Sequence, residues 1–70
     1  MIVPIENKTA TRMSVMLEPL TWTVELEPGQ VAEIVMPTLP DPHELQFDYH
    51  AENWLSVWVP PDATIRVRGA

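Results

Sequence analysis

The chain has no cysteine among its 70 residues, which excludes disulfides, thiolate metal sites and cysteine nucleophiles. Glycine is scarce, with two residues, so few backbone segments can form the amide nests that hold anions. Basic residues are also few: four against ten acidic residues give a formal net charge of −6. Such an acidic chain disfavours nucleic acid and anionic membrane surfaces as partners.

Long apolar runs are missing too. Proline or polar residues interrupt every apolar stretch well short of the roughly 18 residues that a membrane-spanning helix needs. The first residues lack the basic start and long apolar run of a secretory signal. Seventy residues supply one hydrophobic core, so we expect a single domain over residues 1–70, located in the cytoplasm.

Helices have little room, because eight prolines are distributed along the chain and an interior proline costs a helix about 3 kcal/mol. Apolar residues instead alternate with polar ones, a pattern typical of half-buried strands. Pro28 and Gly29 fit the central positions of a type II turn. Strands are expected at residues 2–5, 12–18, 20–26, 31–36, 44–50, 54–59 and 64–68. The sequence therefore predicts an all-β fold, a small antiparallel β-sandwich or jelly-roll-like barrel of six to seven strands.

Two of these segments, residues 31–36 and 54–59, are apolar at nearly every position, as in strands that are covered on both faces. Domains of about this size bury only about 60% of their unfolded surface. They usually add disulfides, a metal or a partner chain to become stable. Since disulfides are excluded, we expect the chain to form a homo-oligomer.

A pattern of turns gives the chain a resemblance to known sequences. Leu17-Glu18-Pro19 is followed by Trp22 and by Leu26-Glu27-Pro28-Gly29. This arrangement resembles short uncharacterised bacterial all-β proteins with an L-E-P…L-x-P-G-x pattern, an apolar strand after it and a tryptophan-containing strand near the C-terminus. The chain departs from the pattern at Leu20, where a tryptophan is expected. The resemblance implies an all-β fold and a bacterial source, and it carries over no catalytic residue.

The segment 44–59 predicts a hairpin with a three-residue connection, Ala51-Glu52-Asn53. We expect His50 opposite Trp54, because this register makes one face of the hairpin wholly apolar and a slip by one residue would mix the faces. Asn53 suits the left-handed backbone that such a turn needs. The apolar pairs would then be Tyr49 with Leu55, Phe47 with Val57, and Leu45 with Val59.

The opposite face of this hairpin is the candidate binding surface. It would carry Gln46, Asp48, His50, Trp54, Ser56 and Trp58. The two tryptophans, four residues apart, would stand about 13 Å from one another. They could pack under a second sheet or loop of the same chain, form a subunit interface, or serve as a platform for a sugar or a protein. Trp22, which would share a strand face with Leu20, Val24 and Leu26, is instead expected in the core.

Chemistry on this face has weaker support. Asp48, His50 and Glu52 alternate and are weak candidates for metal ligands, but the paired histidines of cupins are absent. Asp48, His50 and Ser56 could share a face as a hydrolytic triad, yet no glycine-rich elbow surrounds the serine. We therefore expect no enzymatic activity, no cofactor and no metal. Arg66 and Arg68 are expected to pair with the excess of acidic residues.

The leading functional hypothesis is a non-enzymatic, self-associating small β-sandwich whose cellular role the sequence does not identify. The alternative is a small binding module that takes a carbohydrate or a protein on the Trp54/Trp58 surface. A metal-dependent jelly-roll enzyme is a distant third hypothesis. A small-molecule ligand, if there is one, has no signature in the sequence.

Overall fold

A computed structural model describes residues 1–69 of the chain. In this part there are seven strands and no helix, which confirms the all-β prediction. The alternation of apolar and polar residues places every strand close to where it is expected. The strands are β1 (Ile2–Glu6), β2 (Met13–Glu18), β3 (Trp22–Leu26), β4 (Val31–Val35), β5 (Gln46–His50), β6 (Trp54–Trp58) and β7 (Thr64–Val67).

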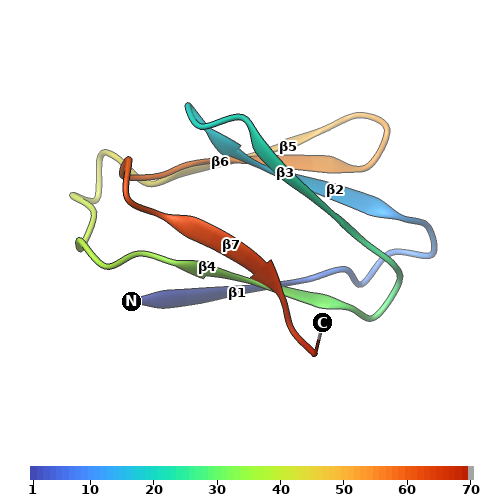
Figure 1. The fold of residues 1–70 in the computed structure, drawn as a ribbon. Helices are drawn as coiled ribbons and strands as arrows, with labels where there is room; N and C mark the ends of the chain where they lie inside the picture. Colours follow the sequence, from blue (N-terminus) through green and yellow to red (C-terminus); the bar gives the residue numbers. More distant parts are fainter. Residues whose placement is uncertain (70) are drawn as a thin grey trace.

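The strands form two sheets that pack face to face as a sandwich (Figure 1). One sheet has three strands in the order β1-β4-β7, and the other has four in the order β3-β2-β6-β5. Alternate side chains of both sheets point inward and form one core, as two packed sheets require. The core consists of Met13, Val15, Leu17, Leu26, Ala32, Ile34, Met36, Val57, Val59, Ala63 and Ile65.

The prediction of a purely antiparallel fold is wrong at one pair of strands. β2 and β6 run parallel, with Val15 opposite Leu55 and Leu17 opposite Val57. A parallel pair needs a long crossover, and here the chain between the two strands passes through the other sheet as β4 before it returns as β5. The alternating pattern of β2 is the same for either direction, so the sequence could not reveal the parallel pairing.

The strand β4 was expected to be covered on both faces, and the structure shows one covered face. Ala32 and Ile34 are fully buried in the core, whereas Val31, Glu33 and Val35 lie half-buried on the outer face. On that face Glu33 accepts hydrogen bonds from Arg66 Nε at 2.9 Å and Arg68 Nη2 at 3.1 Å. The predicted pairing of these arginines with acidic residues is thus confirmed.

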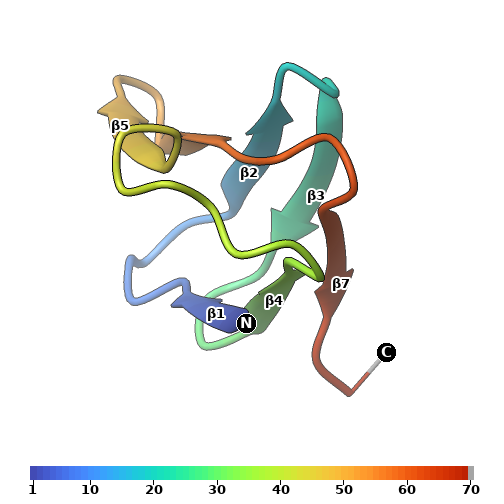
Figure 2. The ribbon, with the colours of Figure 1, turned by 90° about the vertical axis from the view of Figure 1, so that its left-hand side faces the viewer.

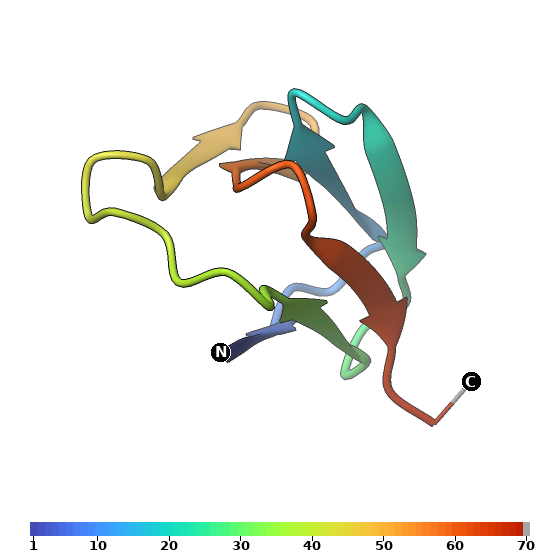
Figure 3. The ribbon, with the colours of Figure 1, turned by 60° about the vertical axis from the view of Figure 1, so that its left-hand side comes forward.

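The two sheets come together at one side of the sandwich and separate at the other. The edge strand β3 lies next to β7 of the opposite sheet (Figure 3). On the other side, the segment 37–45 leads from β4 across to the beginning of β5 (Figure 2). Within residues 1–69, β5 packs against β6 and not against the strands of the three-stranded sheet.

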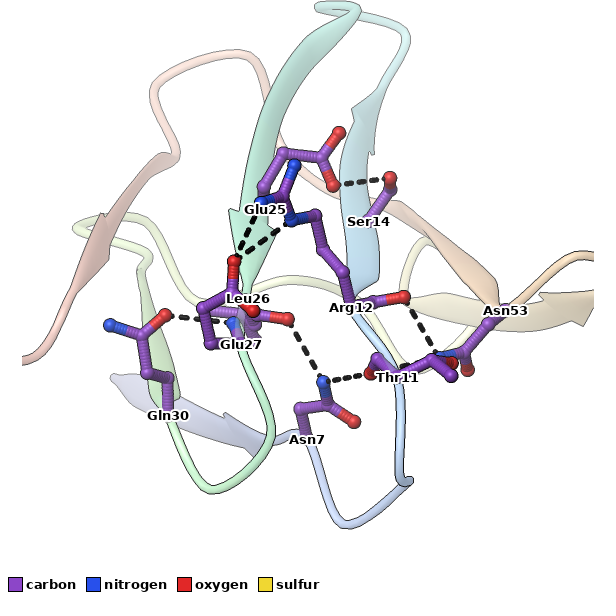
Figure 4. A network of polar contacts seen from close by, with 9 residues as sticks. All are labelled: Asn7, Thr11, Arg12, Ser14, Glu25, Leu26, Glu27, Gln30 and Asn53. Carbon is purple, nitrogen blue, oxygen red and sulfur yellow. Dashed lines mark hydrogen bonds and ion pairs between the residues drawn. The ribbon is translucent and has the colours of Figure 1, made fainter.

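A type II turn and the buried side-chain amide of Asn7 fix two of the connections between strands. Gln30 N donates to the carbonyl of Glu27 at 3.0 Å, and Gly29 has a φ of 86°, which confirms the type II turn. Asn7 is fully buried, and its amide nitrogen donates to the carbonyls of Thr11 and Leu26 at 2.8 and 2.9 Å (Figure 4). Asn7 thereby holds the β1–β2 connection against the end of β3.

Candidate functional site

The β5–β6 hairpin has the register that the sequence predicts. His50 lies opposite Trp54 and Phe47 lies opposite Val57. The turn contains two left-handed residues rather than one: Glu52 has a φ of 67° and Asn53 a φ of 60°. The expected pair of Leu45 and Val59 falls just beyond the paired strands, which end with Gln46 opposite Trp58.

Asn53 attaches the hairpin turn to the rest of the molecule. Its side-chain nitrogen donates to Thr9 Oγ1 at 2.8 Å. The same nitrogen donates to the carbonyl of Arg12 at 3.0 Å (Figure 4). Its side-chain oxygen accepts a hydrogen bond from the Tyr49 hydroxyl. The hairpin is therefore held in place at its turn, and the orientation of both faces is defined.

The candidate binding surface lies on the outer face of the four-stranded sheet, as the register requires. It carries Gln46, Asp48 and His50 from β5 and Trp54, Ser56 and Trp58 from β6. The three-stranded sheet packs on the opposite face and does not cover the two tryptophans. Trp54 is half-buried, and Trp58 borders Pro19, Pro60 and Pro61 of two connections. Trp58 is 43% exposed. Packing against loops of the same chain, a subunit interface and a ligand platform are the roles open to this surface.

A compact polar cluster occupies the middle of this surface. The rings of His50 and Trp54 are stacked, with centroids 3.8 Å apart and an interplanar angle of 13°. His50 Nε2 lies 2.8 Å from Ser56 Oγ, and Ser56 is only 5% exposed. The stacked rings flank the serine, so that His50 and Ser56 satisfy each other's hydrogen-bonding groups away from solvent.

The same cluster does not have the geometry of a hydrolytic triad. The Asp48 carboxylate accepts a hydrogen bond from Gln46 Nε2 at 3.0 Å, whereas a triad needs this carboxylate on the histidine ring. Ser56 Oγ lies 3.5 Å from the backbone carbonyl of Asp48 and is buried, so a substrate carbonyl has no approach to it. The histidine and serine are thus better described as packed structural groups.

The three weak metal candidates do not come together. Asp48 and His50 lie on the same face of β5, but Glu52 lies in the turn beyond the strand, where its backbone is left-handed. Within residues 1–69, no group of three or more histidine, cysteine or carboxylate side chains could hold a metal ion. The separation follows from the turn, which interrupts the alternation that the sequence pattern suggests.

A groove of about 430 Å³ borders the candidate binding surface at Trp58. Its walls come from three connections as well as from β5 and β6. They are Pro19, His43, Glu44, Gln46, Trp58, Val59, Pro60 and Pro61. Of these, the sequence analysis had identified Gln46 and Trp58 as candidates. The others lie in loops far apart in the sequence, and no local pattern indicates that they meet.

The predicted apolar face of the hairpin is buried only on β6. Val57 is fully buried, but its partner Phe47 is 43% exposed and Tyr49 is 63% exposed. The reason is that the described strands of the three-stranded sheet do not pack against β5. The prediction that Trp22 lies in the core is also wrong, because Trp22 begins the edge strand β3 and is 44% exposed.

Comparisons with protein-family models, curated proteins and solved structures found no match to this chain. The resemblance to bacterial proteins with the L-E-P…L-x-P-G-x pattern therefore stays a prediction from the sequence. In the part of the chain that the structure describes, no helix has the length and apolar character to cross a membrane.

Proposed function

We propose that the protein is a non-enzymatic, self-associating β-sandwich and that β5 is the contact between copies. The observation that carries this proposal is the exposure of Phe47 and Tyr49 on the inner face of β5. Phe47 is 43% exposed and Tyr49 is 63% exposed. Aromatic side chains left together in water favour association, because burial of apolar surface is favourable.

The backbone of β5 supports the same proposal. Among residues 1–69, β5 is an edge strand of the four-stranded sheet and pairs with β6 alone. An edge strand presents hydrogen-bonding groups to any second strand that approaches it. A second copy at this edge would cover the two rings and extend the pairing in one step. The burial of Ser56, the one nucleophile candidate on this face, supports the non-enzymatic part of the proposal.

Light scattering on the 70-residue chain at about 100 μM, well above a micromolar dissociation constant, tests the proposal. We expect a mass that is a multiple of the 8.0 kDa chain. The variant Phe47→Gln should lower this mass toward that of the monomer. The matched control is Ile2→Thr, which removes an exposed apolar side chain from the other sheet. A monomeric wild-type protein, or equal effects of the two substitutions, would contradict the proposal.

A second candidate function is the binding module that uses the Trp54/Trp58 surface. The groove beside Trp58 is the specific observation that favours it. Its volume lies within the roughly 300–1,000 Å³ of ligand pockets in general. Self-association is assigned to Phe47, Tyr49 and the edge of β5, whereas the groove lies at the end of the sheet where β5 begins. A cytoplasmic location and a bacterial source stay predictions of the sequence alone.

A further inference from the structure

The groove beside Trp58 exists because two strands run parallel. β2 and β6 end at the same edge of the sheet, with Glu18 opposite Trp58, and β5 begins there because it is antiparallel to β6. Three connections therefore meet at this edge. They supply Pro19 after β2, Pro60 and Pro61 after β6, and His43 with Glu44 before β5.

The apolar part of the groove is made of rigid rings. The indole of Trp58 is 43% exposed, and Pro19 and Pro61 are exposed beside it. Rings of this kind lose little conformational freedom when a ligand binds, so more of the contact energy is kept as affinity. Extended proline-containing segments use such sites, because they are preformed and pack their own rings against aromatic side chains.

The charged part of the groove is acidic. Glu44 is exposed on its wall, and Glu18 lies opposite Trp58 on the neighbouring strand β2, next to the groove residue Pro19. The three arginines that precede residue 69 are engaged elsewhere, Arg12 with Glu27 and the other two with Glu33. With a net charge of −6 on the chain, a positive group of a ligand is attracted here and can also sit on the face of Trp58.

We infer that this groove binds a proline-containing segment of a partner protein that carries arginine or lysine. The inference deepens the second candidate function and does not depend on self-association. A second copy of this chain is a poor occupant, because its own proline-containing segment, residues 37–42, carries Asp41 and leads directly to Glu44. Like charges would then meet in the groove. A sugar is a weaker fit, since the Gln46 amide nitrogen already donates to Asp48.

Titration of the full chain with a synthetic peptide, Arg-Pro-Pro-Arg-Pro-Pro-Arg, tests the inference. Binding is measured by anisotropy of a fluorescein label on the peptide at two salt concentrations. Two further peptides replace every proline by alanine or every arginine by glutamate, and cellohexaose is titrated separately through tryptophan fluorescence. We expect saturable binding of the first peptide, weakened by salt, and at least about tenfold weaker binding of the other two.

Three variants locate the binding site. Trp58→Ala should raise the dissociation constant at least about tenfold, while Trp22→Ala, which removes a tryptophan of equal exposure on another strand, should leave it unchanged. Glu44→Lys alters an exposed loop side chain that the fold does not need and should abolish binding with an unchanged circular dichroism spectrum. This variant keeps the test decisive if Trp58→Ala fails to fold.

The inference is overturned if no peptide binds, if the alanine or glutamate peptide binds as tightly as the first, or if Glu44→Lys binds normally. Saturable binding of cellohexaose that depends on Trp58, without peptide binding, would assign the groove to carbohydrate and overturn the peptide inference. That outcome would still support a binding module. Light scattering of the same samples reports self-association separately, so the failure of one proposal is distinguishable from the failure of the other.

Discussion

Two adjacent residues of the β5–β6 turn have the same backbone conformation but different side-chain contacts. Glu52 and Asn53 are both left-handed, with φ of 67° and 60°. A left-handed backbone costs most L-residues roughly 1–2 kcal/mol, and asparagine tolerates it best. Asn53 also donates hydrogen bonds to Thr9 and Arg12, whereas Glu52 is exposed at the tip of the turn.

Glycine should therefore have opposite effects at these neighbouring positions. Glu52→Gly relieves the unfavourable φ, and after the entropy cost of glycine it should raise the free energy of unfolding by about 0.5–1 kcal/mol. Asn53→Gly keeps an allowed φ but removes the hydrogen bonds, and it should lower this free energy by about 1–2 kcal/mol. Urea denaturation measures both. An unchanged or higher free energy of unfolding in Asn53→Gly would show that the hydrogen bonds of Asn53 do not hold the turn.

At the scale of elements, Glu33 connects β4 to β7 and to the residue that follows it. Its carboxylate accepts hydrogen bonds from Arg66 at 2.9 Å and from Arg68 at 3.1 and 3.3 Å. The hydrogen bond from Arg66, followed by that from Arg68, lowers the pKa of Glu33 below its ordinary value. Charged Glu33 is thus favoured in the folded protein more than in the unfolded chain.

This shift predicts how stability depends on pH. Because the pKa of Glu33 is lower in the folded state, the ion pairs contribute fully above the unfolded pKa of about 4.3. The contribution is lost as the pH falls through the lower folded pKa. The urea concentration at the midpoint of unfolding should therefore decrease less between pH 7 and the acid range in Glu33→Gln than in the wild type. Glu6→Gln, at the end of the neighbouring β1, is the control and should behave like the wild type.

At the scale of the whole molecule, the two sheets differ in width. A three-stranded sheet faces a four-stranded one, and they approach each other at β3 and β7. The fourth strand, β5, is left without a facing layer, and its inward-pointing Phe47 and Tyr49 stay exposed. Chains near this length have little stability in reserve, so a partner on this surface would matter for folding as well as for assembly.

Self-association should therefore make thermal stability depend on protein concentration. If dissociation accompanies unfolding, a tenfold rise in concentration should raise Tm by about 3–6 °C for a dimer of 70-residue chains. Differential scanning fluorimetry over a hundredfold range measures the effect. Phe47→Gln should show a Tm independent of concentration, while Ile2→Thr keeps the dependence. A wild-type Tm that is constant over this range would count against association coupled to folding.

The sequence by itself determined the all-β class, the positions of the strands and the register of the β5–β6 hairpin. These follow from local physics. Alternation with a period of two selects strands, the three-residue connection sets the register, and Asn53 accepts a left-handed backbone. The prolines restrict helices in the same local way. Even the members of the candidate binding surface, from Gln46 to Trp58, follow from this register.

Only the tertiary structure decided which sides are covered and which distant segments meet. The burial of a residue such as Phe47 depends on the width of the opposite sheet, and nothing in the alternation around it carries that information. The groove beside Trp58 depends on the parallel pairing of β2 and β6, which brings Pro19 and Glu44 to one edge. Local patterns define faces, but the packing of whole sheets determines what each face contacts.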